Sequence, residues 1–214
     1  MSTANATHAA AHAHAFPYPV TISVASPDGL RDRLTILLRP VMAIPHLLFV
    51  GPAWMVTRFG AAGILGTAAY LFAIVNWFSI LVGHGDLKSA REFQLYYLRW
   101  RTRALAYQAL LVDLYPPFGD GTYPAAIEVG EAPAVRDRAT IAVRPLLAIP
   151  HFVVLFFLLT AGFIVTLAAW LVMLVTGRYP ERVRPFVIGS LTWLLRVEAY
   201  MLLLVDEYPP FAFD

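Results

Sequence analysis

The sequence has no cysteine among its 214 residues. Disulfide bridges, thiolate metal sites and cysteine nucleophiles are therefore excluded, and cysteine usage gives no information on the redox compartment. Motifs of several enzyme classes are missing as well, because the chain contains no His-Glu-x-x-His, Gly-x-Ser-x-Gly or P-loop pattern. We therefore expect a protein without enzymatic activity, without a metal and without a cofactor.

Charge is also scarce. Hydrophobic residues make up 59% of the chain and charged residues 14%, against roughly 45–50% and about 25% in soluble domains. Residues 59–84 and 145–177 carry no formal charge, and each run is longer than the ~18 residues that indicate a membrane-spanning helix. The composition predicts an integral membrane protein, and a net charge of +2 gives no reason to expect a nucleic-acid partner.

The chain contains the same unit twice. Residues 31–46 and 136–151 share 11 of 16 residues at a constant offset of 105. Further along, the offset falls to 93 and aligns two tryptophans and two Tyr-Pro-Pro-Phe segments: Trp77 with Trp170, and residues 115–118 with 208–211. The second copy therefore lacks twelve residues between its histidine and its tryptophan. A repeat of this length indicates a duplicated small domain, not a solenoid unit.

We predict a mainly α-helical membrane fold made of two tandem repeats. Each repeat is expected to contain a transmembrane helical hairpin, an interfacial amphipathic helix and a short β-strand. The predicted segments are a disordered Ala/His tail (1–17), repeat 1 (18–118), a linker (119–122) and repeat 2 (123–214). The tail has no lysine, arginine or apolar core, which is unlike a signal peptide.

Lysines and arginines gather at the ends of the apolar segments, so both termini and all basic clusters are expected on the cytoplasmic side. In repeat 1 we predict a hairpin over about 34–82 that turns near 57–60. In repeat 2 the segment of about 139–176 leaves room for two short passes that turn near 160–162, or for one tilted span from 152 to 176. The charge placement favours two hairpins, the second shallow or re-entrant.

Each repeat then ends in a long helix, predicted over about 86–114 and about 181–206. The first mixes arginines with aromatic residues, which is typical of a helix in the membrane interface with its arginines toward anionic headgroups. The second is more apolar and can lie deeper. Residues 20–24 and 127–129 alternate in the manner of strands, and we expect them to pair between the repeats.

Two arginines lie within the apolar segments, and each has a histidine seven residues later, two helical turns along the same face. An intramembrane arginine is costly and therefore a candidate functional residue. We expect this face to bind an anionic lipid headgroup or to line a polar cavity. Alternatively, the arginine pairs with an aspartate near the end of a long helix and the histidine caps a free carbonyl. The residues are Arg39, His46 and Asp113, and Arg144, His151 and Asp206.

Three arginines of the long helices complete the set that we expect to bind lipid or a partner: Arg99, Arg103 and Arg196. The repeated unit combines a Tyr-Pro strand, Arg-Pro-x-x-x-Ile-Pro-His and a terminal Tyr-Pro-Pro-Phe. In these motifs the chain resembles a bacterial integral-membrane family catalogued only as a domain of unknown function. The resemblance covers nearly all residues after 17. It implies a fold and a location in the inner membrane, with no catalytic residues to carry over.

The sequence therefore predicts a non-catalytic membrane scaffold or accessory subunit of a larger complex. Its partners would be anionic lipids and other membrane proteins, or further copies of itself. The alternative is a small transporter or lipid-handling protein with a site between the two repeats.

Overall fold

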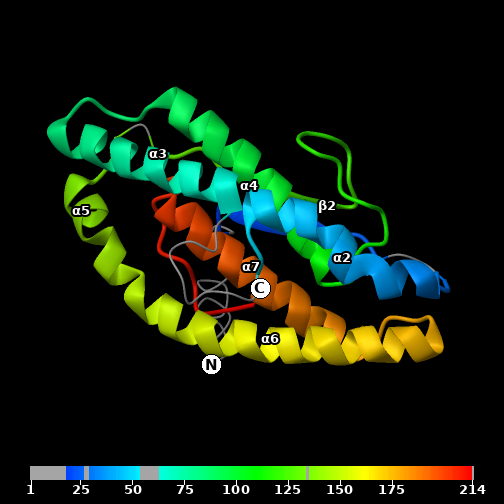
Figure 1. The fold of residues 1–214 in the computed structure, drawn as a ribbon. Coiled ribbons are helices and arrows are strands. Elements are labelled where there is room, and N and C mark those ends of the chain that lie inside the picture. The colour runs from blue at the N-terminus through cyan, green and yellow to red at the C-terminus, as the bar shows by residue number, and fades with distance from the viewer. Residues whose placement is uncertain (1–17, 27–28, 54–62, 134, 214) are drawn as a thin grey trace, which may run out of the picture.

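The computed structural model describes residues 18–26, 29–53, 63–133 and 135–213, and within them the protein is mainly helical (Figure 1). The elements are β1 (Val20–Val24), α2 (Arg33–Val50), α3 (Gly63–Val82), α4 (Lys88–Gln108), β2 (Ala125–Val129), α5 (Arg138–Leu147), α6 (Ile149–Thr176), the 3₁₀ helix η1 (Glu181–Val183) and α7 (Arg184–Met201). The predicted tail at 1–17 and the predicted turn at 57–60 lie outside the described residues.

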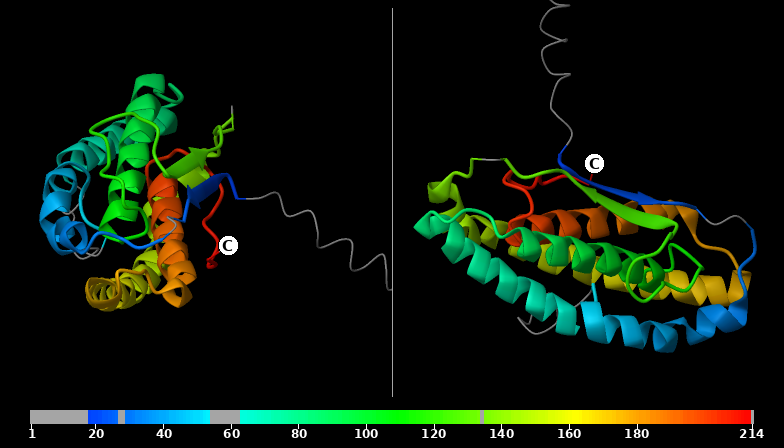
Figure 2. Two further views of the ribbon diagram at one scale, coloured as in Figure 1. Left: turned by 90° about the vertical axis from the view of Figure 1, so that its right-hand side faces the viewer. Right: turned by 90° about the horizontal axis from the view of Figure 1, so that it is seen from above.

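Helices α2 and α3 lie end to end and together run along α4 in the opposite direction (Figure 1 and the right-hand view of Figure 2). Their contacts follow the long helix and its ends in order: Arg39 with Val112, His46 with Trp100, Ala69 with Gln94, and Asn76 with Leu87. We call α2 and α3 together the first arc. They therefore do not form the side-by-side hairpin that the sequence predicts within residues 34–82.

The junction of the first arc is tight. Gly63 begins α3 with a φ of +70°, and a Cβ built on it would lie 2.5 Å from the carbonyl carbon of Phe49. A side chain at this position would collide with backbone, which cannot move aside as a flexible side chain can. Glycine is therefore required where α3 begins against the end of α2.

The second arc, α5 and α6, has no such interruption. Helix α6 is continuous for 28 residues and passes straight through 160–162, so the predicted turn there is wrong. Thr160 does not break the helix, because its hydroxyl donates a 2.6 Å hydrogen bond to the carbonyl of Phe156 one turn earlier. Gly162 lies on the buried side of α6.

Both arcs bury the same narrow stripe, at the three- and four-residue spacing of one helical face. The buried positions are 36, 39, 43, 46, 50, 66, 69, 73, 76 and 80 in the first arc, and 141, 144, 148, 151, 155, 159, 162, 166, 169 and 173 in the second. Each position of the first list matches one of the second at an offset of 105 or 93. The two arcs are therefore structurally equivalent, and the twelve additional residues after Val50 leave the inward face unchanged.

Helices α4 and α7 lie between the arcs and a small ribbon, as the end-on view of Figure 2 shows. Strands β1 and β2 form this ribbon as an antiparallel pair in which Ile22 faces Ile127, so the predicted pairing between the repeats is confirmed. Strand β2 contacts α4 and β1 contacts α7. The apolar core lies under the ribbon and includes Leu98, Leu105 and Leu195.

The burial of α4 differs from the expected interfacial helix over 86–114. Residues 100–107 are buried, and Arg101 and Arg103 lie inside the protein, where protein groups accept their hydrogen bonds. Its exposed charged side chains include Lys88, Glu92 and Arg99. Helix α7 is buried almost completely from Gly189 to Tyr200, in keeping with its more apolar sequence.

Candidate functional site

Arg39 joins the first arc to the end of α4. Its guanidinium donates to the carbonyl of Val112 at 3.0 Å and to the carboxylate of Asp113 at 2.9 Å, and it lies 4.7 Å from the ring centre of Tyr107. The residue is 2% exposed. Arginine suits this place because its planar fork serves a carbonyl, a carboxylate and an aromatic face together.

Arg144 makes the equivalent set of contacts in the second repeat. It donates to the carbonyl of Val205 at 3.0 Å and to Asp206 at 2.7 Å, and it lies 4.4 Å from the ring centre of Tyr200. A further bond of 2.8 Å reaches the carbonyl of Tyr200. The sequence left two alternatives for these arginines, a lipid-binding face or an ion pair with an aspartate. In the structure each arginine forms an ion pair within its own repeat.

A second arginine reaches each of these aspartates. Arg31 lies 3.1 Å from Asp113 and donates to the carbonyl of Leu110 at 2.5 Å. The equivalent Arg136 bonds Asp206, and also Asp86 at 2.6 Å. Neither arginine is among the site residues predicted from the sequence, although the Arg-Asp-Arg triplet that opens each repeated motif contains them.

His46 lies under the Tyr-Pro-Pro-Phe segment of its own repeat. Its Nδ1 accepts a 2.9 Å hydrogen bond from the indole N–H of Trp100, and its ring stacks on Phe118 with centroids 4.4 Å apart. Tyr115 covers it from a third direction at 4.9 Å. Because Nδ1 accepts, the proton of a neutral ring lies on Nε2.

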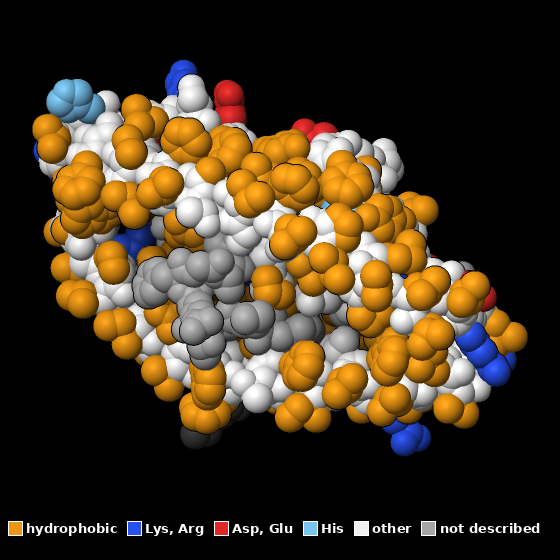
Figure 3. Space-filling view, in the orientation of Figure 1, with side chains coloured by type: hydrophobic (Ala, Val, Ile, Leu, Met, Phe, Trp, Pro, Cys, Tyr) orange, Lys and Arg blue, Asp and Glu red, His pale blue; other side chains and the backbone are white. Residues whose placement is uncertain are grey.

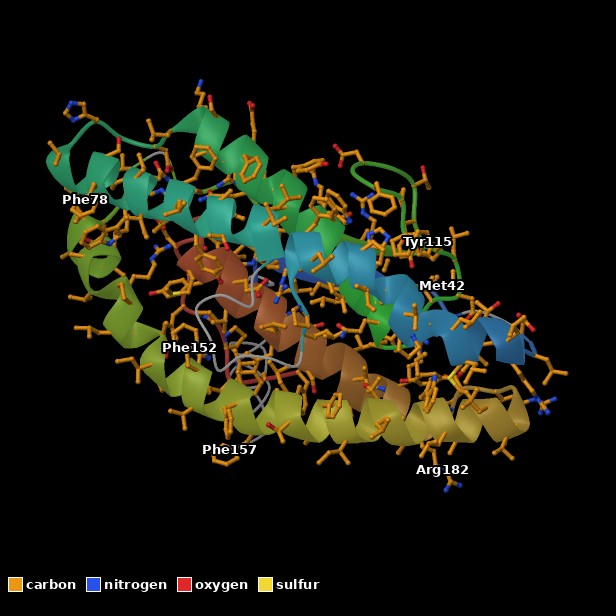
Figure 4. The ribbon with its side chains drawn as sticks, in the orientation of Figure 1. Met42, Phe78, Tyr115, Phe152, Phe157 and Arg182 are labelled. Carbon is orange, nitrogen blue, oxygen red and sulfur yellow. The ribbon has the colours of Figure 1, made fainter. Side chains whose placement is uncertain are left out.

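His151 repeats this arrangement with Trp193 at 3.1 Å and Phe211 at 4.2 Å. From the sequence, one alternative was that each histidine caps a free carbonyl. In the structure, Nδ1 of each histidine accepts a hydrogen bond from an indole N–H. The repeated Pro-His and Tyr-Pro-Pro-Phe motifs are thus two sides of one packing arrangement. Figure 4 shows Tyr115 beside α2, at the place where this segment folds back over the arc.

The arcs are also bonded to one another by tryptophans. The indole of Trp77 donates to the carbonyl of Ile141 at 2.8 Å, and that of Trp170 donates to the carbonyl of Ile36 at 2.9 Å. These four residues are equivalent in pairs under the repeat offsets. Each repeat therefore supplies an indole N–H that donates a hydrogen bond to a backbone carbonyl of the other repeat.

The remaining predicted residues have different surroundings. Arg103 donates to the carbonyl of Gly121 at 3.2 Å and lies 3.4 Å from Asp120, so it holds the predicted linker at 119–122. Arg196 donates to the carbonyl of Val20 at 3.2 Å and lies over the ring of Tyr18. Arg99 is exposed on α4. Burial raises the pKa of Tyr123, and both Arg39 and Arg103 oppose this shift; Arg196 and Arg144 act on Tyr18 in the same way. Arg103 and Arg196 therefore lie near the arginines of the apolar segments, whereas Arg99 does not join them.

One buried ion pair has no equivalent in the other repeat. Arg101 of α4 lies 2.7 Å from Glu198 of α7, and its counterpart positions are Leu194 and Leu105. Burial lowers the pKa of the Arg101 guanidinium, whereas Glu198, Tyr97 and Tyr70 raise it and together outweigh burial, so the net shift is upward. Burial raises the pKa of Glu198, and Arg101 opposes this shift. The mismatch between Arg101 and Leu194 is the sequence signal for this pair.

Arg101 also holds the end of α2. Its guanidinium bonds the carbonyl oxygens of Val50 and Gly51, the latter at 3.0 Å, and Gln108 accepts from the N–H of Ala53 at 3.3 Å. The two carbonyls are groups that the C-terminal end of a helix leaves without partners, and Ala53 lies just beyond that end.

A pocket of about 300 Å³ lies between the repeats. Its lining combines residues of α2, of the end of α4 and of α6: Arg39, Pro40, Ala43, Leu47, Gln108, Leu110, Phe163, Thr166, Leu167 and Trp170. In the part of the chain that the structure describes, no cluster of three or more acidic, histidine or cysteine side chains is placed to hold a metal ion.

Comparison with known proteins supports the duplication. A family model described as "Domain of unknown function (DUF4389)" matches residues 48–119 and again residues 138–212, once in each repeat. No curated protein and no solved structure matches the chain.

Proposed function

The chain belongs to the DUF4389 family, and from this premise we propose that it is a non-catalytic scaffold or accessory subunit of a bacterial inner membrane. Its arcs would lie in the lipid, and its other side would bind partner proteins and anionic headgroups. The observation that carries the proposal is the apolar surface of the two arcs. Helices α2 and α3 and the joined helix of residues 138–176 are each long and apolar enough to cross a membrane. In an apolar 18-residue stretch of each helix, only 28% is buried inside the protein.

Large apolar side chains stand on the outer faces of both arcs along their whole length. Leu48 is 62% exposed in the first arc, and Phe157 is 67% exposed in the second. Figure 3 shows such side chains across the face of the molecule, and in Figure 4 Phe157 points away from the bundle. Water-soluble monomers rarely expose an apolar surface of this extent, whereas lipid tails solvate it without cost.

Charged residues gather at the two ends of the arc layer. Gly177 lies against Arg31 and Arg33 at one end, where Arg182 also projects (Figure 4), and Gly83 lies against Arg138 at the other. The 39 residues of the second arc would extend ~58 Å as helix, about twice the ~30 Å of a hydrocarbon core. We therefore place both arcs within one leaflet, along the membrane plane. Both termini would face the cytoplasm, where basic residues collect.

The partner side in this proposal is the side of the ribbon and α4. It carries exposed charged residues that no contact in the arc layer requires, among them Glu92, Arg99 and Glu128. Ion pairs or headgroup contacts at such positions are sensitive to salt, which suits a reversible partner. The second candidate, a lipid-handling protein with a site between the repeats, is favoured by the pocket that both repeats line.

Cysteine labelling tests the placement, because the natural chain has no cysteine. A polarity-sensitive fluorophore at Leu71→Cys or Phe157→Cys should be quenched by brominated lipid in reconstituted vesicles. The same label at Glu128→Cys should not be quenched. Equal, weak quenching at all three sites would mean that a protein surface, not lipid, covers the arcs.

The same approach distinguishes an arc in the plane from an arc that crosses. His84→Cys and Arg182→Cys lie at opposite ends of the arc layer, and both side chains are exposed. In intact cells, an impermeant thiol reagent should reach neither of them if both face the cytoplasm. Labelling at one end alone would support a membrane-spanning arc instead.

A further inference from the structure

We propose that the pocket between the two repeats binds a fatty acid, with the chain along its apolar wall and the carboxylate at Thr166 and Arg39. This inference rests on the proposed placement of the arcs in lipid, because a membrane is the source of such a ligand. The site deepens the second candidate function by naming the ligand class and the residues that would hold it.

The size and lining of the pocket suit one chain. A volume of about 300 Å³ lies at the small end of the range for ligand sites, too little for a lipid with two chains. Leu47 of α2 and Phe163 and Leu167 of α6 supply apolar wall, and all three belong to arcs that the proposal places in hydrocarbon.

Thr166 carries a polar atom that the protein leaves unsatisfied. Its hydroxyl is buried and has no hydrogen-bond partner, although the residue is 8% exposed. Thr160 and Thr176 of the same helix behave as expected in an apolar segment, because each donates to a carbonyl four residues earlier. A buried hydroxyl without a partner is destabilising, so the exception at Thr166 points to a ligand atom.

Charge favours an anionic headgroup. Arg31 and Arg39 share the single carboxylate of Asp113, and the Nε of Arg39 is buried without a partner. Arg39 also lines the pocket, so its positive charge lies where a carboxylate headgroup would bind.

The equivalent place in the other repeat has an arginine with a buried, unpartnered Nε as well, Arg144, but lacks the other features. Under the repeat offsets, Thr166 corresponds to Ala73, Gln108 to Met201 and Leu47 to the larger Phe152. Both polar groups are absent there, and Phe152 adds volume where Leu47 leaves room. The proposed site is therefore present once in the molecule. The residues at the equivalent positions show which substitutions the same helix packing accepts.

The test measures binding to the purified full chain in a neutral detergent at mildly alkaline pH. A brominated fatty acid should quench tryptophan fluorescence saturably, since Trp170 lines the pocket, and Trp170→Phe should remove most of that signal. The unlabelled fatty acid should displace the probe, whereas its methyl ester should compete far more weakly.

Two variants locate the site. Thr166→Val keeps the shape and removes the hydroxyl, so it should weaken binding about tenfold or more, as expected for the loss of a hydrogen bond to a charged group. Thr160→Val, on the same helix with its hydroxyl bonded internally, is the matched control and should bind normally. The double variant Leu47→Phe/Thr166→Ala copies the other repeat and should abolish saturable quenching while retaining the helical circular dichroism spectrum.

Quenching that rises linearly with probe, or that is equal in the double variant, would overturn the site, because both describe partition into the micelle alone. Equal competition by acid and methyl ester would overturn the role of the carboxylate. The vesicle-quenching labels at Leu71 and Phe157 report the membrane placement separately, so a failure of this site remains distinguishable from a failure of the proposed function.

Discussion

The two repeats share their arginine, histidine and tryptophan contacts but differ in the middle of the arc. In the second repeat α6 is unbroken there, and α7 has Leu194 and Met201 at the positions that correspond to Arg101 and Gln108. In the first repeat α2 ends, and α4 presents Arg101 and Gln108 to the freed backbone groups. Glu198 of the opposite repeat then balances the buried charge of Arg101. A break in a buried helix therefore brings with it the polar residues that satisfy its ends.

The largest expected loss of stability comes from removing the residue that distinguishes the two repeats, Arg101. Arg101→Leu copies the second repeat but leaves Glu198 buried without its partner, so it should destabilise the protein by ~3–5 kcal/mol. The double variant Arg101→Leu/Glu198→Leu should recover part of this loss and no more, because the carbonyls of Val50 and Gly51 still lack a donor. Chemical unfolding in detergent, followed by circular dichroism, measures both. Full recovery in the double variant would show that the carbonyl contacts contribute nothing.

The ion pairs Arg39–Asp113 and Arg144–Asp206, which we call the arginine clamps, are alike in the two repeats and should respond alike to mutation. Arg39→Met and Arg144→Met each remove one of two arginines from an aspartate, and each should cost ~2–4 kcal/mol in thermal or chemical unfolding. Adding Asp113→Asn to Arg39→Met should restore little, because Arg31 would then lose its partner as well. A large loss in one repeat and none in the other would contradict the equivalence of the clamps.

The histidines should give a smaller and again equal effect. His46→Phe keeps an aromatic ring under the Tyr-Pro-Pro-Phe segment but leaves the indole N–H of Trp100 without an acceptor. The expected loss is ~1–3 kcal/mol, and His151→Phe should match it through Trp193. Unfolding curves of the two variants provide the measurement. His46→Gln, which retains an acceptor, serves as the control.

The smallest effect concerns acid. The Thr35 hydroxyl and N–H bond the Asp32 carboxylate at the start of α2 and hold its pKa below the ordinary value, and Thr140 does the same for Asp137 at the start of α5. A lowered pKa in the folded state stabilises the fold above the unfolded pKa, and this contribution is lost as the pH falls through the folded value. Helicity should therefore decrease slightly in the acidic range below a pH of about 4. Asp32→Asn should reduce this acid dependence, and an unchanged profile would rule out the cap.

Much of the fold follows from the sequence, and the failures have physical causes. The repeat, the helical content and the pairing of residues 20–24 with the second repeat were all predicted, because each depends on local pattern or on identity between the copies. The prediction of a turn at 160–162 was wrong. It assumed that each repeat crosses the membrane an even number of times, so that all basic clusters lie on one side. Twelve helical residues would rotate a helix face by about 120°. The stripe nevertheless continues on the same inward face from Val50 to Gly66, so the added length between α2 and α3 does not displace it.

The site was only partly predictable for a different reason. Arg39 and His46 were found because an arginine and a histidine in an apolar segment are unusual and recur at the same spacing. Their surroundings were harder to infer, since the hydrogen-bond partners of Arg39 are residues more than 70 positions away. Arg101 was not predicted, because its position is a leucine in the second repeat and the predicted site residues are mostly those that the repeats share.

The ribbon pairs Ile22 with Ile127, which are the same position in the two repeats, and the tryptophan bonds are exchanged in the same reciprocal way. Contacts of this kind are those of a twofold homodimer, in which each surface meets its own copy. A single repeat would have to find a second molecule before its strand and its carbonyl at Ile36 gained partners. Covalent linkage removes that dependence on protein concentration, because the second half is always present at high effective concentration. Linkage also frees each half to acquire residues that would be useless in duplicate, as Arg101 in one half and Glu198 in the other illustrate.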